Sequence, residues 1–189
     1  MRIEPVEGRE EIPTGLLGTI YAPEIGRAAM EYSRVTYAAS RLSLREFEAA
    51  RVVTAYINGC QLCQNWRSAV DLPLYLKSLG EDGTPSVANN GPAPDDDFYR
   101  AIATWRDATL FSPREKIAME LAEGMGEKPK KIAADEEFWA RARALYSDAE
   151  IVDLSYCIAC WMGLGRMTHV LGLDGICGLP SAAPGSAAG

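Results

Sequence analysis

Residues 43–63 read SLREFEAARVVTAYINGCQLC, a stretch that predicts a capped helix followed by two closely spaced cysteines. Ser43 and Glu46 form a capping box, in which the serine hydroxyl accepts from the third amide of the helix and the glutamate side chain accepts from the serine amide. Apolar residues then recur at helical spacing. Asn58 and Gly59 both tolerate a positive φ angle, so this pair predicts the end of the helix.

The same capping pattern begins two further segments, Ser112-Pro-Arg-Glu115 and Ser147-Asp-Ala-Glu150. The first of these extends into a short internal resemblance, because LSLREFEA at 42–49 aligns with FSPREKIA at 111–118. This alignment indicates a weak internal duplication of a helical unit. In this alignment Glu48 corresponds to Ile117, so the second unit lacks a carboxylate at that position and cannot repeat the role of Glu48.

The rest of the chain predicts an all-α, multihelical domain over residues 1–177. A second helix is expected from about Cys60 to Pro73, and others at about 97–108, 113–125, 135–145 and 148–166. Residues 80–97 are rich in Gly and Pro and predict a long loop between two halves. The Ala-, Pro-, Ser- and Gly-rich residues 178–189 predict a disordered tail.

Composition narrows the class of protein. A length of 189 residues with 48% hydrophobic and 24% charged residues fits one soluble domain with a sizeable core. The net charge of −7 argues against nucleic acid and anionic membranes as partners. The most apolar stretch, 151–170, is interrupted by Asp153, Arg166 and His169, and residues 1–22 lack the apolar core of a signal peptide. We therefore expect a cytoplasmic protein without a membrane span.

The two cysteines at the end of the opening stretch predict thiol chemistry. Cys60 and Cys63 are three residues apart, which places both on one face of a helix and close enough to form a disulfide. Five cysteines in a cytoplasmic chain of this size do not indicate a disulfide framework. Glu48 and Arg67 are spaced to reach the same face, where a carboxylate and a guanidinium could tune the thiols.

The patterns Leu42-Ser43-x-x-Glu46-x-Glu48 and Asn58-Gly59-Cys60-x-x-Cys63 resemble the carboxymuconolactone decarboxylase family, over about residues 25–175. The resemblance is closer to its AhpD-like alkylhydroperoxidase branch. That branch has a Glu, eleven residues, Cys-x-x-Cys, three residues and a His. Glu48, Cys60 and Cys63 match at this spacing, whereas Arg67 stands where the His would be.

The resemblance implies an all-α fold, homo-oligomers (trimers or hexamers), and neither metal nor cofactor. It implies that Cys63 attacks a hydroperoxide or disulfide substrate and that Cys60 resolves the product as a disulfide. In the branch it resembles, the Glu and the His relay the proton. We expect the reductant to be a dithiol partner, such as a lipoylated or thioredoxin-like protein.

Arg67 in place of the His changes this expectation. A positive charge four residues after Cys63 favours its thiolate, typically lowering a thiol pKa by ~1–3 units. A guanidinium cannot transfer the proton, which leaves Glu48 acting through water. We therefore expect weaker peroxidase activity than in a His-bearing relative, with thiol–disulfide exchange less affected. Two structural alternatives stay open: Arg67 pairs with Glu48, or Glu48 pairs with Arg51 or Arg45.

Three other features have competing interpretations. Cys157 and Cys160 are either buried apolar residues, a second redox pair or half of a zinc site. They lie too far from Cys63 for compact zinc spacing, and their flanks, Leu154-Ser-Tyr and Trp161-Met-Gly-Leu-Gly, favour a buried helix. His169, the only histidine, either packs or folds back to Cys63 as the missing base. Trp66 either walls the pocket or lies at a subunit interface, and Trp161 is expected in the core.

Two rival functions remain. One is a cofactor-free decarboxylase or lactone-acting enzyme in which Arg67 holds a carboxylate through its bidentate fork. The other is a non-catalytic helical assembly that keeps a relict site.

Overall fold

The computed structural model describes residues 2–4, 7–8, 17–78 and 80–173, and these residues form helices and no β-strand. The all-α prediction is confirmed. The expected tail 178–189 lies outside the described residues. The helices are α1 (Leu17–Tyr21), α2 (Pro23–Ala39), α3 (Leu44–Asn58), α4 (Gln61–Asn65), α5 (Ser68–Ser78), η2 (Val87–Asn89), α6 (Asp96–Ala101), η3 (Ile102–Thr104), α7 (Pro113–Glu127), α8 (Pro129–Ala133), α9 (Glu136–Leu145) and α10 (Asp148–Val170).

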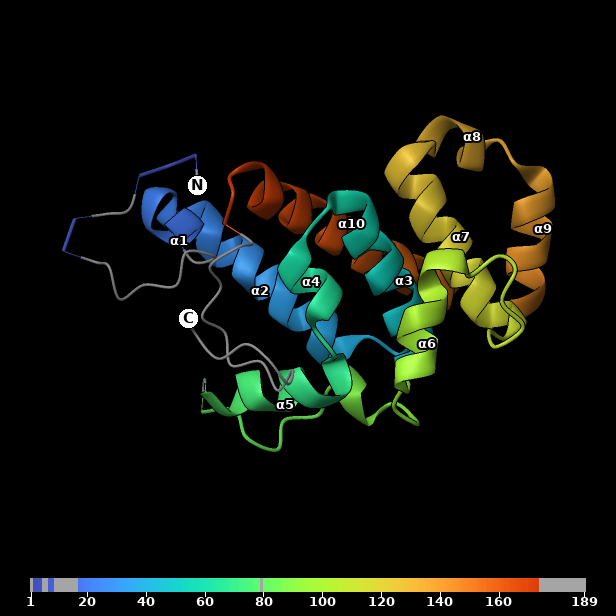
Figure 1. Cartoon of the computed structure of the whole chain (residues 1–189), viewed down its shortest axis with the longest axis horizontal. Coiled ribbons are helices and arrows are strands. Elements are labelled where there is room, and N and C mark those ends of the chain that lie inside the picture. Colours follow the sequence, from blue (N-terminus) through green and yellow to red (C-terminus); the bar gives the residue numbers. More distant parts are fainter. Residues whose placement is uncertain (1, 5–6, 9–16, 79, 174–189) are drawn as a thin grey trace.

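Helix α3 lies at the centre of the fold. Most of its side chains are buried, and it packs chiefly against α7 and α10. Phe47 of α3 is fully buried and meets the ring of Trp161 edge to face, with ring centroids 4.6 Å apart. Figure 1 shows α2 and α10 beside α3, with α8 and α9 at the end of the molecule opposite α1. The chain segment that carries the cysteine pair is therefore anchored to the core.

All three predicted capping boxes are present. Ser43, Ser112 and Ser147 each accept from the amide three residues later, and the glutamate at that position accepts from the serine amide. The predicted stop of α3 is also confirmed, because Gly59 adopts a left-handed conformation with φ of 72°. These helix ends depend on contacts within a few residues, which is why the sequence pattern predicts them.

The internal resemblance has a structural counterpart where α3 and α7 begin side by side. Arg45 at the start of α3 donates to Glu115 at the start of α7 over 2.6 Å. In return, Arg114 of α7 donates to Glu46 of α3. The two matched segments thus exchange equivalent ion pairs across an approximate local symmetry.

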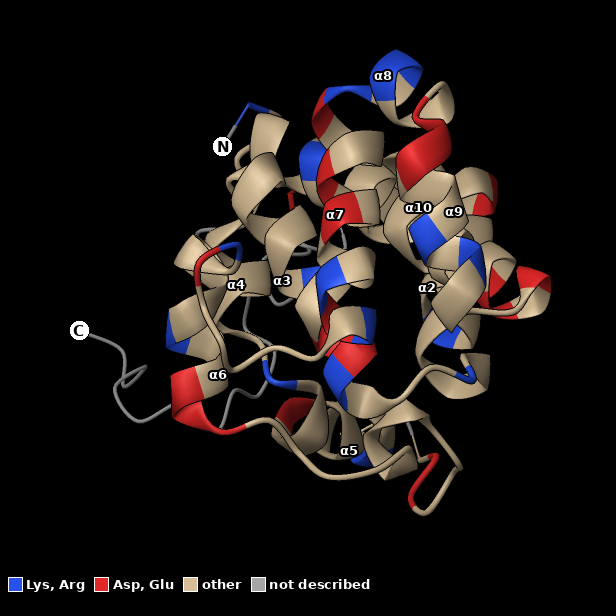
Figure 2. Cartoon of the chain, turned by 90° about the vertical axis from the view of Figure 1, so that its right-hand side faces the viewer, with Lys and Arg blue, Asp and Glu red and all other residues tan. Residues whose placement is uncertain are grey.

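Charged residues follow the ends of several surface helices. Figure 2 shows acidic residues at the start of α6 and basic residues on α8. Asp95 caps α6 by accepting from the amide of Phe98 over 2.9 Å, and two more aspartates fill its first turn. Negative charge at a helix N-terminus, and Lys130 and Lys131 in the last turn of α8, complement the helix dipoles.

The single helix expected from Cys60 to Pro73 is wrong, because the chain forms two helices there. Trp66 has an extended backbone conformation that ends α4, and α5 continues past Pro73. Asp71 accepts from the amide of Arg67 over 2.6 Å, which starts α5 afresh. Leu72 is 2% exposed, and its burial explains why α5 continues through the proline.

Other boundaries differ by smaller amounts. The helix expected at 97–108 is shorter, with α6 followed by the 3-10 turn η3, and the short helix α8 was not predicted. The loop at 80–97 contains the 3-10 turn η2. Asn90 fastens this loop to the start of α3, because its side chain donates to the carbonyls of Ser40 and Leu42. None of the described helices combines the length and apolarity that crossing a membrane requires.

Replacing Gly59 with alanine is expected to lower the free energy of unfolding by about 1–3 kcal/mol. An added Cβ would lie 3.0 Å from Nε2 of His169, and the φ of 72° is unfavourable for alanine. Gly163→Ala in α10 is the matched control, because nothing lies within 4 Å of its added Cβ and alanine favours helix. Urea unfolding of both variants measures the difference, and equal effects would contradict the expectation.

Candidate active site at the cysteine pair

Cys60 and Cys63 form a disulfide at the start of α4, with their Cα atoms 5.3 Å apart. Cys60 is the N-cap residue, and its sulfur accepts from the amide of Cys63 over 3.3 Å. Gly59 makes this possible, since its left-handed turn ends α3 immediately before the first cysteine. Cys60 is completely buried, whereas Cys63 is partly exposed. The two sulfurs are therefore not equivalent: only Cys63 can meet a molecule that arrives from outside.

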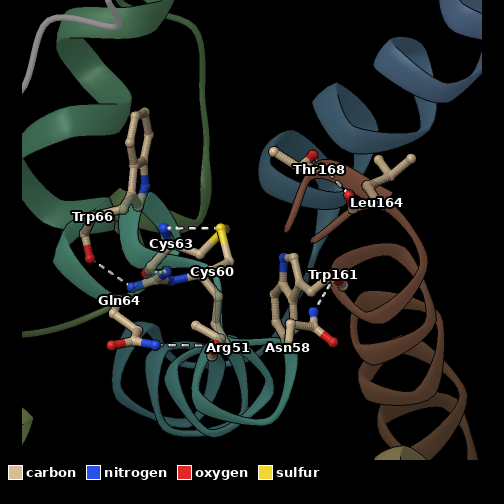
Figure 3. The surroundings of a disulfide bond; sticks show 10 residues. Arg51, Asn58, Cys60, Cys63, Gln64, Trp66, Trp161, Leu164 and Thr168 are labelled. Carbon is tan, nitrogen blue, oxygen red and sulfur yellow. Dashed lines mark hydrogen bonds between the residues drawn. A yellow bond between two sulfur atoms is a disulfide. The ribbon is translucent and has the colours of Figure 1, made fainter. Parts of the chain in front are cut away.

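Cys63 lies on the wall of a cavity of about 220 Å³. Residues of α2, α3, α4, α5 and α10 and of the turn between α4 and α5 line it, and the lining is mainly apolar. Figure 3 shows the disulfide and Trp66 on one side of this space and residues of α10 on the other. The lining residues are Met30, Ser33, Arg34, Tyr37, Arg51, Ala55, Asn58, Leu62, Cys63, Trp66, Leu72, Tyr75, Leu76, Cys160, Trp161, Leu164, Gly165 and Thr168.

Arg51 is the cation that contacts the cysteine segment. Its side chain is 3% exposed, and its guanidinium donates to the carbonyl of Cys63 over 2.7 Å and to the carbonyl of Trp66 over 2.6 Å. Figure 3 shows the guanidinium reaching these carbonyls from α3. Arg51 thereby fixes the turn that holds Cys63, and it also lines the cavity.

Glu48 lies directly behind Arg51 and is fully buried. Its carboxylate accepts from Nε of Arg51 over 2.5 Å and from NH2 over 3.0 Å, and from the hydroxyls of Ser68 and Tyr99, each over 2.6 Å. Burial by itself would raise the pKa of Glu48. The charge and hydrogen bonds of Arg51, together with the two hydroxyl donors, outweigh it and hold the pKa below its ordinary value.

Arg67 lies in the same region but is not a lining residue of the cavity. Its guanidinium stacks on the ring of Tyr99, 3.7 Å from the centroid, and donates to the carbonyls of Gln64 and Trp66 over 2.8 and 3.1 Å. Glu48 pairs with Arg51, which was one of the two alternatives that the sequence left open. The charge that both touches the Cys63 backbone and borders the cavity is that of Arg51.

His169 packs on the residue before the disulfide. Its ring lies so close to Gly59 that Nε2 would be 3.0 Å from a Cβ at that position. The residue is in the last turn of α10, next to the cavity residue Thr168. It is not itself among the residues that line the cavity.

The second cysteine pair is free and buried in α10. Cys157 donates to a carboxylate oxygen of Asp153 over 3.4 Å, and burial is the main reason why the pKa values of both Cys157 and Cys160 are raised. These contacts favour the interpretation as buried thiols. Cys160 nevertheless borders the same cavity as Cys63. No cluster of three or more His, Cys, Asp or Glu residues that could hold a metal ion occurs in the described part of the chain.

Of the residues predicted for the site, Cys60 and Cys63 are bonded to each other, and Glu48 is connected to the Cys63 backbone through Arg51. The structure also adds residues that the sequence analysis did not identify as part of the site. Arg51 was considered only as an ion-pair partner, and Ser68 and Tyr99 were not singled out. The available signal was the Glu48–Arg51 spacing of three residues, which joins two side chains on one helix face. No sequence signal places Tyr99 of α6, which is 51 residues from Glu48 along the chain.

Comparisons with known proteins support the fold. No protein-family model matches the chain, and no curated protein matches it. A crystal structure of a protein of unknown function from Agrobacterium tumefaciens, described as a candidate antioxidant defence protein AhpD, is similar with a TM-score of 0.60. The two sequences are 19% identical, and the match covers 82% of this chain and 92% of that one. The chain thus has an AhpD-like fold.

Proposed function

We propose that this protein is a thiol-dependent oxidoreductase in which Cys60 and Cys63 alternate between dithiol and disulfide. The observation that carries the proposal is the asymmetry of the pair: Cys63 borders the cavity and is partly exposed, while Cys60 is buried behind it. An attacking thiolate must reach its substrate, whereas a resolving thiol needs only to reach its partner.

With a hydroperoxide, the Cys63 thiolate attacks the terminal oxygen, so that an S–O bond forms and the O–O bond breaks. The other oxygen leaves as an alkoxide and takes up a proton to become an alcohol, and Cys63 is oxidised to a sulfenic acid. The Cys60 sulfur then attacks the Cys63 sulfur, forms the disulfide and releases water. A dithiol partner restores the reduced pair by exchange and is itself oxidised to a disulfide.

We assign Arg51 and Glu48 as positioning residues in this cycle. Arg51 holds the Cys63 turn through two carbonyls and places a permanent positive charge beside it. Glu48 keeps Arg51 oriented, and its four accepted hydrogen bonds and lowered pKa favour a fixed carboxylate over a proton carrier. The proton for the leaving oxygen then comes from solvent, which favours disulfide exchange over rapid peroxide reduction.

The printed description of the structural neighbour as a candidate antioxidant protein supports the peroxidase form of the proposal. We further propose a cytoplasmic homo-oligomer, trimer or hexamer. Exposed apolar side chains of α2 and α10, among them Ile25, Tyr156 and Val170, support contacts between copies. The lactone-acting alternative requires Arg67 to hold a substrate carboxylate. The contacts of Arg67 do not support it, because the guanidinium stacks on Tyr99 and donates to backbone carbonyls.

Mapping thiols by mass spectrometry tests the function. The reduced protein is exposed to cumene hydroperoxide or to an oxidised lipoyl compound and is then alkylated. We expect the loss of two hydrogens, located in a peptide that links Cys60 to Cys63. The Cys157→Ser variant should give the same product, because its thiol is buried and its pKa is raised. Alkylation of both Cys60 and Cys63 after oxidant treatment would refute the proposal.

A further inference from the structure

Three buried polar atoms in the described structure have no hydrogen-bond partner, and all three belong to residues that line the cavity beside Cys63. They are Oδ1 of Asn58, Nε1 of Trp66 and Nε1 of Trp161. Buried polar groups are nearly always paired, and an unpaired one destabilises the protein. Three such atoms around one cavity indicate a site that is complete only when another molecule occupies it.

The two indole rings come from opposite sides of the cavity. In Figure 3 the ring nitrogen of Trp66 points toward the Cys60–Cys63 disulfide, and that of Trp161 points into the space between the disulfide and Thr168. Trp161 is only 9% exposed, and its ring is held edge to face against Phe47. The N–H donor of Trp161 is thus fixed in place by the core, and the N–H donor of Trp66 lies across the cavity from it beside the disulfide.

Asn58 fixes the wall behind Trp161. Its side-chain nitrogen donates to the carbonyl of Trp161 over 2.9 Å. A Cβ on Gly165 would lie 2.6 Å from that nitrogen, so glycine is required for this close approach. The amide is 6% exposed and keeps its oxygen as an unused acceptor. The wall is therefore preformed and does not depend on a ligand to shape it.

The volume limits the size of the occupant. A cavity of about 150 Å³ lined by apolar side chains binds benzene, so the 220 Å³ here suits about ten non-hydrogen atoms. The mainly apolar lining favours an apolar body, and two N–H donors favour an oxygen that accepts.

We propose that this cavity is a binding site for a compact, mainly apolar organic molecule whose oxygen accepts hydrogen bonds from the indole N–H groups of Trp66 and Trp161. The cavity and its two indole donors are present in the disulfide form, so this binding does not depend on the proposed function. Where that function also holds, the same donors hold the oxygen that leaves as alcohol. They then supply hydrogen bonds at a site where the neighbouring guanidinium of Arg51 does not transfer a proton.

A matched pair of probes tests the proposal on the oxidised full-length protein. Acetophenone and α-methylstyrene have nearly the same shape, but only acetophenone carries an accepting oxygen. The indole nitrogens are labelled with ¹⁵N, and the Nε1–H signals are followed by NMR. Acetophenone is expected to shift the signals of Trp66 and Trp161 in the direction that hydrogen bonding causes. α-Methylstyrene is expected to shift neither signal in that direction. The chain has four tryptophans, so the signals are assigned by single Trp→Phe variants.

Trp161→Phe is expected to reduce the ratio of acetophenone to α-methylstyrene affinity by about three- to tenfold, the worth of one hydrogen bond. Trp139→Phe is the control, because its indole donates to the carbonyl of Ile132 outside the cavity. Indole signals that stay unmoved in the unmutated protein, or the same affinity ratio in Trp161→Phe as in the unmutated protein, would overturn the proposal. The spectra of the unmutated protein decide the question even where a variant fails to fold, and no turnover enters the result.

Discussion

Replacing Arg51 with methionine is expected to lower the free energy of unfolding at neutral pH by about 3–5 kcal/mol. The variant leaves the Glu48 carboxylate completely buried without its cation and removes the donors to the carbonyls of Cys63 and Trp66. Methionine has a similar length, so the effect reports mainly charge and hydrogen bonding rather than lost volume. Guanidinium chloride unfolding, followed by far-UV circular dichroism, gives the measurement.

Two comparisons isolate the cause of this loss. Arg141→Met removes a paired arginine from the surface, where its partner Glu120 is also partly exposed, and should cost only about 0.2–1 kcal/mol. Combining Arg51→Met with Glu48→Gln removes the stranded charge and should recover part of the stability. A loss below about 1 kcal/mol in Arg51→Met would contradict the role assigned to this pair.

The pH dependence of the same pair has a definite sign. The pKa of Glu48 is lowered in the folded protein from its ordinary value of 4.5, so its contribution is fully present above that value. The contribution is lost as the pH falls through the folded pKa. In Arg51→Met the buried carboxylate lacks its cation, so the deficit relative to the unmutated protein should shrink as the pH is lowered.

Cys63→Ser is expected to reduce hydroperoxide consumption at least about 100-fold, because a serine hydroxyl does not ionise to replace the attacking thiolate. Cys60→Ser should behave differently. Its Cys63 still borders the cavity, so one equivalent of hydroperoxide should be consumed and a sulfenic acid should remain. Single-turnover kinetics combined with a sulfenic-acid trapping reagent distinguish the two variants.

The opposite pattern would identify another activity. If Cys63→Ser keeps full turnover, the cysteines are not the reacting groups and the cofactor-free, lactone-acting function regains weight. Equal behaviour of the two serine variants would contradict the assignment of Cys63 as nucleophile and Cys60 as resolving thiol. That assignment follows from their unequal exposure, with Cys60 fully buried.

Much of the fold is predictable because it depends on short-range contacts. The three serine capping boxes and the glycine stop at position 59 each involve groups within a few residues of one another. The break between α4 and α5 is different. The contact of Asp71 with the Arg67 amide is local, but the extended turn at Trp66 also receives two hydrogen bonds from Arg51 of α3. These bonds join residues 12 and 15 positions apart, so no local pattern indicates them.

For the candidate site, spacing along the chain determined that Cys60 and Cys63 lie within bonding distance, because they are three positions apart at the start of a helix. The same spacing predicted Glu48 as part of the site, and in the structure Glu48 is connected to Cys63 through Arg51. Only the tertiary structure decided which arginine serves them. Arg67 follows a break in the helix that turns its guanidinium onto Tyr99, whereas Arg51 extends from the buried helix directly to the Cys63 carbonyl. The tertiary structure also decided that the indole N–H groups of Trp66 and Trp161 lack hydrogen-bond partners, because helices far apart in sequence meet at one cavity. A sequence pattern does not show which buried polar atoms are left unpaired after the helices pack.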